Sequence, residues 1–294
     1  MKEIVVVSGK GGTGKTSLVA SLAVLARVSV LADCDVDAAD LHLVLKPAIN
    51  KTEDFTGGKK ATIIPGQCSN CGKCYEVCRF GSITRHEGKH PAYSVDSISC
   101  EGCGVCSYFC PEKAINFEPA VNGQWFVSDT RYGPMVHARL GIAAENSGKL
   151  VSLVRSEARR IAEQTKLPYI IVDGPPGIGC PVIASITGAD AVLIVTEPTV
   201  SGEHDLERVA ALAGHFKIPV YLCVNKFDIN PGLGETIERE ARSAGITLVG
   251  RIHYDPAITA AQMKGVPVMS LAGTIAAKDI REVWHKLATY VDTN

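Results

Sequence analysis

A glycine-rich loop close to the start of the chain constrains the fold more than any other feature. Residues 9–16 read Gly-Lys-Gly-Gly-Thr-Gly-Lys-Thr and fit the pattern G-x-x-x-x-G-K-[ST]. The stretch before the loop, residues 3–8, is apolar and β-branched like a buried strand, and apolar residues recur at helical spacing after it. A strand, a loop of this kind and a helix in succession predict an α/β domain.

The loop has the residue types of a phosphate-binding site. Its glycines allow backbone N–H groups to point at phosphate oxygens, and the start of the helix adds partial positive charge. We expect Lys15 to reach the β- and γ-phosphates of a nucleotide, and the Thr16 hydroxyl to ligate Mg²⁺. The predicted nucleotide-binding residues of the loop are Gly9, Lys10, Gly11, Gly12, Thr13, Gly14, Lys15, Thr16 and Ser17.

Beyond the loop, apolar strands alternate with helices along most of the chain. This order predicts a mostly parallel sheet covered by helices on both faces. The expected strands lie at 28–31, 169–172, 191–195, 220–224 and 247–249, and the expected helices at 147–166, 203–214, 233–244 and 275–291.

Three segments together resemble the MinD/ParA/Mrp family of P-loop ATPases, which also includes the nitrogenase iron protein. The loop carries an early lysine, Lys10, as in the family's GKGGTGKT form. Asp33-Cys-Asp35 follows the second expected strand, where the family's first switch loop begins. Asp173-Gly-Pro-Pro-Gly177 follows another strand, as the second switch loop does. The resemblance implies a P-loop NTPase fold.

The resemblance also implies roles for these residues. Lys10 is expected to reach across a dimer interface to the partner's nucleotide. Asp35 is expected to orient the attacking water, with Asp33 and Asp40 as alternatives, and Asp173 to hold Mg²⁺ through water. The implied catalytic residues are Lys10, Lys15, Asp35 and Asp173.

Two more nucleotide contacts follow from the same resemblance. The Gly177 N–H is expected to sense the γ-phosphate, and Asn225 to read adenine. Asn225-Lys-Phe-Asp228 also reads as N-K-x-D, which selects guanine in Ras-like proteins. We favour adenine, because the phosphate loop and both switch loops resemble the branch that uses ATP.

Eight of the eleven cysteines lie between residues 68 and 110, in two runs that share the same spacing. Each run reads C-x₂-C-x₂-C-x₃-C, as in bacterial ferredoxins, where the fourth cysteine of a run ligates the cluster of the other run. Thiolates suit iron–sulfur clusters, and two Cys₄ zinc sites are the alternative. In the first run, Arg79 stands at the position directly after the fourth cysteine, where a proline is usual. The predicted ligands are Cys68, Cys71, Cys74 and Cys110 for one 4Fe–4S cluster, and Cys100, Cys103, Cys106 and Cys78 for the other.

Nucleotide-binding features lie on both sides of the cysteine runs, so the ferredoxin-like module is predicted to be an insert. We expect residues 56–119 to form this module, and residues 1–55 and 120–294 to form the ATPase domain. The remaining cysteines are predicted to be small buried residues. They are Cys34, Cys180 and Cys223.

Charge and hydropathy narrow the range of partners. The formal net charge is −1, which does not indicate a nucleic-acid binder. No apolar run reaches the roughly 20 residues of a membrane helix, and the charges on the last expected helix are mixed, unlike a tail for anionic lipid. With no signal peptide visible, we expect a cytoplasmic protein that has no nucleic-acid partner and no stable membrane association.

These features predict an ATPase, activated by dimerisation, whose nucleotide state gates electron transfer or docking of two 4Fe–4S clusters. The expected cofactors are ATP, Mg²⁺ and the two clusters. The expected partners are a second copy or a related ATPase, and a redox or metallocluster client protein. The alternatives are a metallocluster assembly or insertion factor of the Mrp type, and a non-catalytic, nucleotide-dependent ferredoxin that only docks.

Overall fold

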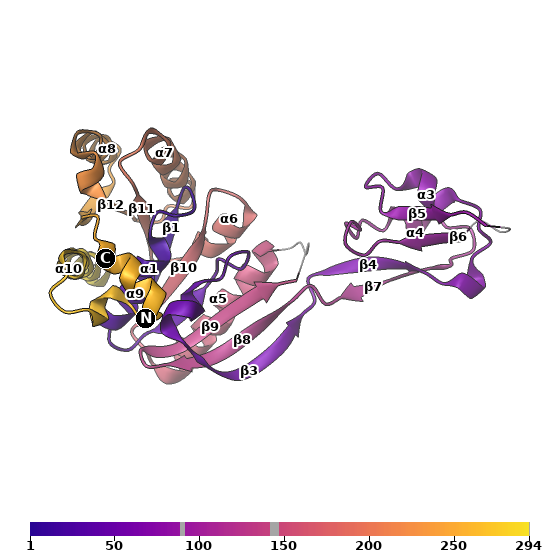
Figure 1. Ribbon diagram of the computed structural model, residues 1–294, viewed down its shortest axis with the longest axis horizontal. Coiled ribbons are helices and arrows are strands. Elements are labelled where there is room, and N and C mark those ends of the chain that lie inside the picture. Colours follow the sequence, from indigo (N-terminus) through magenta and orange to yellow (C-terminus); the bar gives the residue numbers. More distant parts are fainter. Residues whose placement is uncertain (89–91, 142–146, 294) are drawn as a thin grey trace. The chain divides into compact units, whose positions relative to one another are not determined.

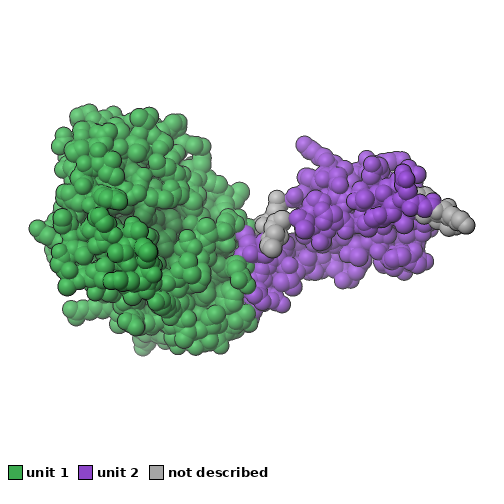
Figure 2. All heavy atoms as spheres, in the orientation of Figure 1, with its two compact units in different colours: residues 1–52, 125–139, 147–294 green, residues 53–124, 140–146 purple. Residues whose placement is uncertain are grey.

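The computed structural model describes residues 1–88, 92–141 and 147–293, and it contains two compact units, coloured separately in Figure 2. The predicted insert, residues 56–119, lies within the second unit. Unit 1 comprises Met1–Thr52, Trp125–Arg139 and Ser147–Asn294, and unit 2 comprises Glu53–Gln124 and Leu140–Asn146.

A nine-stranded sheet forms the centre of unit 1, with the order β13-β12-β11-β1-β10-β2-β9-β8-β3 (Figure 1). Every neighbouring pair from β13 to β9 is parallel. The mostly parallel sheet predicted from the sequence is therefore confirmed. The strands are β1 Lys2–Ser8, β2 Val30–Asp33, β3 Ala48–Phe55, β8 Gly123–Thr130, β9 Gly133–Leu140, β10 Tyr169–Pro176, β11 Ala191–Thr196, β12 Val220–Asn225 and β13 Thr247–Ile252.

Helices cover both faces of this sheet. Ile4 and Val6 of β1 belong to a buried cluster that also contains Leu22 and Ile280 from helices α1 and α10, whereas Val5 is fully buried outside that cluster. Because side chains alternate along a strand, both faces of β1 are covered. The helices of unit 1 are α1 Lys15–Leu25, α2 Leu41–Leu45, α5 Ser147–Thr165, α6 Cys180–Ile186, α7 Val200–His215, α8 Pro231–Ser243, α9 Pro256–Lys264 and α10 Ile275–Thr293, with short 3₁₀ turns η2 Phe227–Ile229 and η3 Val268–Ser270.

The second strand begins later than the sequence predicts. The expected range was 28–31, whereas β2 is Val30–Asp33. Arg27 has a φ of 61° and Val28 is 51 % exposed, so the chain is still turning after α1 at these positions. The shift places Asp33 at the end of the strand itself, paired in register with Asp173 of β10.

Unit 2 combines two small antiparallel sheets with two short helices. Strand β4 (Gly58–Ile63) pairs with β7 (Ile115–Ala120), and β5 (Ile83–His86) pairs with β6 (Ala92–Val95). The helices are α3 Lys73–Val77 and α4 Val105–Phe109, and a 3₁₀ turn, η1, covers Pro65–Gln67. The small core of this unit consists of Ala61, Cys74, Ile83, Cys100 and Ile115. Across the described residues of both units, no helix is long and apolar enough to span a membrane.

Candidate functional site

A cavity of about 750 Å³ opens where the carboxyl ends of β1, β2 and β10 meet in unit 1. Ligands of open parallel sheets bind at this end of the strands. The cavity is lined by Ser8, Gly11, Gly12, Thr13, Gly14, Lys15, Thr16, Ser17, Asp35, Asp37, Ala38, Asp40, Leu43, Val44, Pro175, Pro176, Pro181 and Gln262.

The phosphate loop owes its shape to glycine. Gly12 and Gly14 have φ values of 82° and 85°, a region that other residues rarely adopt. A Cβ on Gly14 would also collide with the side-chain amide of Asn225. That amide donates to the carbonyl oxygen of Thr13 at 2.7 Å, so the end of β12 supports the loop directly.

Lys15 is bound by carboxylates inside the cavity. Its Nζ lies 2.7 Å from Asp173 Oδ1 and 3.4 Å from Asp35 Oδ2, and the residue is 6 % exposed. Burial alone would lower the pKa of Lys15, but the charges of Asp173 and Asp35 outweigh it, and the net pKa is raised. Lys15 is therefore a protonated ammonium. Phosphate oxygens could replace the two carboxylates as its partners.

The three aspartates proposed for the attacking water lie in different surroundings. Asp33 is fully buried, and its carboxylate accepts the N–H groups of Asp35 and Leu41, so it shapes the switch loop from within. Burial and the nearby charge of Asp173 raise the pKa of Asp33. Asp40 is exposed at the cavity edge. Asp35 alone combines partial burial, an open cavity and contact with Lys15, and burial raises its pKa as well.

Asp173 has one carboxylate oxygen to spare. The residue is 1 % exposed, and Oδ2 has no hydrogen-bond partner among the described residues, whereas Oδ1 accepts from Lys15. A buried carboxylate oxygen without a partner is costly unless a cation or water completes it. With the Thr16 hydroxyl on the same cavity, this oxygen suits a hydrated Mg²⁺, the hard cation that carboxylate and hydroxyl oxygens favour.

The backbone N–H of Gly177 is already engaged. It donates to the carbonyl oxygen of Ser8 at 2.8 Å, and Gly177 has a φ of 89°. Contact between this N–H and a γ-phosphate, as the sequence predicts, requires it to leave Ser8. The loop at Gly177, predicted to be the second switch loop, is thus hydrogen-bonded to the end of β1.

Lys10 contacts its own chain. Its Nζ donates to the hydroxyls of Thr199 at 3.3 Å and Ser201 at 3.0 Å, and lies 3.7 Å from a carboxylate oxygen of Glu197. These residues surround the start of α7. Lys10 is not among the residues that line the cavity.

Asn225 and Lys226, at the end of β12, bind the phosphate loop through their side chains. Besides the Asn225 contact, Lys226 Nζ donates to the carbonyl oxygen of Gly12 at 3.2 Å and pairs with Glu197. Asp228, the residue of the guanine interpretation, instead accepts the backbone N–H of Tyr254 at 2.6 Å.

Gln262 is a cavity residue that sequence reasoning missed. It lies on α9, far along the chain from the phosphate loop, and its Nε2 donates to the Ser17 hydroxyl at 2.7 Å. No motif marks it, because only the tertiary packing of α9, which contacts α2 and η3, brings it to the cavity.

Each predicted set of four cysteines lines its own cavity in unit 2. The first quartet is Cys68, Cys71, Cys74 and Cys110, and the second quartet is Cys78, Cys100, Cys103 and Cys106. Each of these cavities is small, about 20 Å³. The structure thus brings the fourth cysteine of each run to the other run.

The surroundings of the quartets suit a cluster. The sulfur of Cys68 accepts the Asn70 N–H at 3.4 Å, and the sulfur of Cys110 accepts the Ala114 N–H at 3.3 Å. Burial, together with neighbouring cysteine charge, raises the pKa of Cys74 and Cys106. Four crowded sulfurs with N–H donors suit a positively charged iron centre shared among them.

Of the three remaining cysteines, two are buried and one is not. Cys34 and Cys223 are fully buried, and burial raises the pKa of both thiols. The prediction was wrong for Cys180, which is exposed. Cys180 is the first residue of α6, directly after the second switch loop, and the start of a helix at the cavity rim faces solvent on one side.

Comparison with known proteins places the chain in a family. Residues 4–268 match the family described as the CobQ/CobB/MinD/ParA nucleotide binding domain. A solved structure, the septum site-determining protein MinD of Pyrococcus horikoshii complexed with Mg-ADP, superimposes with a TM-score of 0.60 over 99 % of this chain and 98 % of that chain, at 16 % identity. This likeness shows the shared fold.

The relatives of the chain include several proteins of Methanocaldococcus jannaschii. An uncharacterized protein is 32 % identical over 78 % of this chain and 79 % of its own length. An iron-sulfur cluster carrier protein is 22 % identical over 99 % of this chain and 85 % of its own length. An uncharacterized ferredoxin is 42 % identical over 17 % of this chain and 65 % of its own length.

Proposed function

Since the chain belongs to the CobQ/CobB/MinD/ParA nucleotide-binding family, we propose that it is an ATPase whose nucleotide state controls electron transfer from two 4Fe–4S clusters to a partner protein. The observation that carries this proposal is the pairing of the cysteines into two quartets, each around its own cavity, in a chain that also has a complete phosphate-loop cavity. Similarity to a ferredoxin over 52 residues supports the cluster assignment.

The ATPase residues act in a defined order in this proposal. Phosphate oxygens take Lys15 from Asp173 and Asp35. The released Asp35 carboxylate, whose pKa is raised by burial, then orients water for attack on the γ-phosphate. Asp173 and Thr16 would hold a hydrated Mg²⁺, which would supply charge neutralisation at the phosphates.

Dimerisation belongs to the same proposal. Lys10 leaves Thr199 and Ser201 and crosses to the nucleotide of a second copy or a related ATPase. A single chain holds this lysine away from its own cavity lining, which supports a role outside its own site. The Gly177 N–H leaves Ser8 when a γ-phosphate is bound, so the second switch loop distinguishes ATP from ADP.

Iron and sulfide analysis tests the clusters. Protein purified without oxygen should contain about eight iron and eight acid-labile sulfide per chain, from two 4Fe–4S clusters. Two zinc ions per chain without sulfide would refute this part of the proposal.

Redox titration tests the coupling. The titration is run without nucleotide, with ADP and with a non-hydrolysable ATP analogue, in the wild type and in Asp35→Ala. Linkage typically amounts to about 1–3 kcal/mol, or roughly 45–130 mV for a one-electron couple. Equal potentials in all three states, together with an unchanged rate of electron transfer to the partner, would leave gating unsupported.

A second candidate function is delivery of whole clusters to client proteins. It is favoured by the similarity to an iron-sulfur cluster carrier protein along 99 % of the chain. Mixing the loaded protein with a cluster-free acceptor separates the two functions. A redox protein keeps its iron and passes electrons, whereas a carrier loses iron to the acceptor when nucleotide is added.

A further inference from the structure

The two cysteine quartets repeat one local structure. In each run a glycine with φ near 80° precedes the short helix: Gly72 before α3 and Gly104 before α4. An aromatic side chain packs against each glycine. Tyr93 lies against Gly72, and Phe117 lies against Gly104. Two sites with the same local structure would give two clusters of equal reduction potential, unless a residue outside the repeated structure distinguishes them.

Lys60 distinguishes them. It lies on β4, is half-buried, and its Nζ donates to the carbonyl oxygen of Cys100 at 2.5 Å. Cys100 is a member of the second quartet and is 9 % exposed. Among the described residues of unit 2, a full positive charge is therefore fixed against the backbone of a predicted cluster ligand only at the second quartet.

The other charges near the quartets do not reproduce this contact. Lys73 and Glu112 line the first cavity, are both exposed and have opposite signs. Glu101 lines the second cavity, but it is exposed and has an interaction partner of its own. Water screens exposed charges more strongly than a half-buried one.

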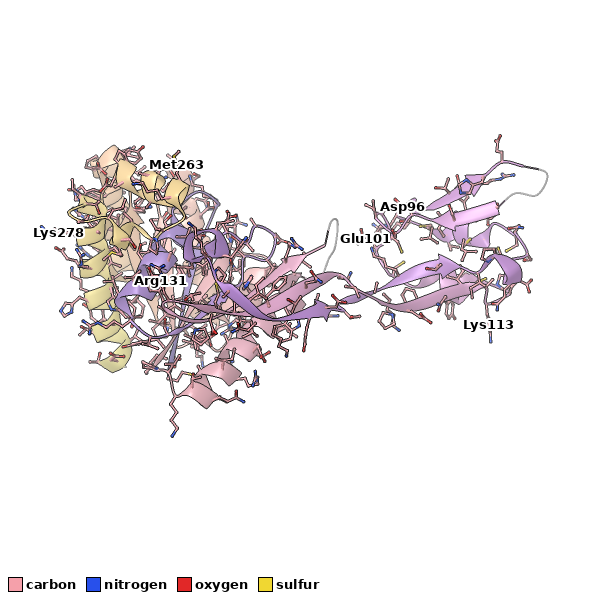
Figure 3. All side chains as sticks on the ribbon, turned by 60° about the horizontal axis from the view of Figure 1, so that its bottom comes forward. Asp96, Glu101, Lys113, Arg131, Met263 and Lys278 are labelled. Atoms are coloured by element: carbon pink, nitrogen blue, oxygen red, sulfur yellow. The ribbon has the colours of Figure 1, made fainter. Side chains whose placement is uncertain are left out.

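Two carboxylates lie near Lys60 itself. Glu118 is directly opposite Lys60 in the β4–β7 pair, and Asp96 is close enough for Lys60 to contribute to its lowered pKa, behind its main hydrogen bond from Ser99. Both carboxylates are exposed, and Asp96 is labelled in Figure 3. They weaken the field of Lys60 without cancelling it.

We propose that Lys60 makes the two clusters unequal, so that the cluster of the second quartet accepts an electron at a higher potential than the cluster of the first quartet. A positive charge stabilises the form with one more electron, and no bond or proton is transferred in the step. The electron comes from a low-potential one-electron donor, such as dithionite in a titration. The inference rests on the proposed function, since both quartets must hold clusters.

The size of the effect follows from Coulomb's law. With an effective dielectric constant of about 20, a unit charge at roughly 10 Å changes an equilibrium on the order of tenfold. For a one-electron couple, a tenfold change is about 59 mV. The electron then resides mainly on the second quartet, which becomes the point from which it leaves.

The test is an anaerobic redox titration followed by electron paramagnetic resonance. Wild-type protein should show two reduction potentials about 59 mV apart, which corresponds to a tenfold difference in the reduction equilibrium. Lys60→Gln should lower the higher potential by that amount and leave the lower one unchanged, and Lys60→Arg should restore it. Lys60→Met, which keeps the aliphatic stem, serves if the glutamine variant loads poorly.

Lys113→Gln is the matched control. Lys113 is in the same unit and is exposed, and its side chain extends away from the unit in Figure 3, so its loss removes the same charge with little effect on the higher potential. Two equal potentials in the wild type would overturn the inference without any variant. So would a control that shifts the higher potential as much as Lys60→Gln does.

Failure of the inference and failure of the proposed function are distinguishable. If iron and sulfide reach about eight each per chain but the potentials are equal, Lys60 does not tune the clusters and the proposed function stands. If the quartets hold no iron, the proposed function fails together with the inference.

Discussion

Lys15 Nζ lies 2.7 Å from Asp173 Oδ1, and this buried contact joins the phosphate loop to the end of β10. The pairing stabilises the loop before any nucleotide arrives, because neither charge could remain buried alone. It also means that a nucleotide must outcompete a carboxylate for the lysine. Binding of phosphate and release of Asp173 are thus one event.

Lys15→Ala should abolish most nucleotide binding. The variant loses a charged phosphate contact and leaves Asp173 without its partner, so affinity for ATP should fall about 100-fold, equivalent to roughly 2.7 kcal/mol. Isothermal titration of ATP and ADP against the two proteins measures the loss. Lys10→Ala is the matched control: binding should stay within about threefold of wild type, while ATP-driven dimerisation and turnover are lost. Normal ATP hydrolysis by Lys10→Ala would remove the proposed role of this lysine.

Adenine should be preferred over guanine. Asp228 accepts the Tyr254 N–H, so its carboxylate is engaged with backbone, whereas the Asn225 amide lies against the phosphate loop. Competition between ATP and GTP on one preparation measures the preference. Asp228→Asn should leave the ratio unchanged, and Asn225→Ala should reduce ATP affinity about tenfold. Tighter binding of GTP than ATP would show that the base assignment is wrong.

Gly177→Ala should slow ATP turnover more than it weakens ADP binding. Gly177 has a φ of 89°, and no described residue lies within 4 Å of a Cβ added there, so a methyl group adds backbone strain on the order of 1–2 kcal/mol. The strained loop should exchange Ser8 for a γ-phosphate less readily, and turnover should drop about tenfold or more. Steady-state hydrolysis and ADP titration give the two values.

Gly245→Ala is its control, because Gly245 has a φ of 78°, equally open surroundings, and a place at the end of α8 away from the cavity lining. It should cost similar stability and leave turnover unchanged. If both variants lose turnover alike, strain in general explains the effect and the Ser8 contact does not.

Glu3→Gln should strongly destabilise unit 1. Glu3 is 2 % exposed and binds both Arg155, which is 5 % exposed, and Arg159. Removing its charge leaves a buried guanidinium unpaired, which costs about 3–5 kcal/mol. Glu157→Gln breaks a pair with Arg160 on the outer side of α5 and should cost less than about 1 kcal/mol. Urea unfolding followed by circular dichroism compares the two, and equal midpoints would contradict the importance of the buried pair.

The amino-acid sequence by itself determined the parallel-sheet fold and the grouping of the cysteines. Both are local patterns: the phosphate loop lies within a continuous segment between a strand and a helix, and the spacing of three cysteines fixes which sulfurs can surround one cavity. Continuously apolar strands likewise indicate burial on both faces of the sheet. Such features can be recognised in the sequence because residues that are close along the chain are also close in space.

Only the tertiary structure decided which distant side chains meet. Gln262 of α9 reaches Ser17 of α1, and Lys60 of β4 reaches Cys100 of the second cysteine run, although neither pair is close in the sequence. It also decided that Asp33 is fully buried and that Cys180 is exposed. The type of a residue does not show which distant residue will bury it or pair with it. Burial and charge pairing nevertheless set the chemistry of these groups.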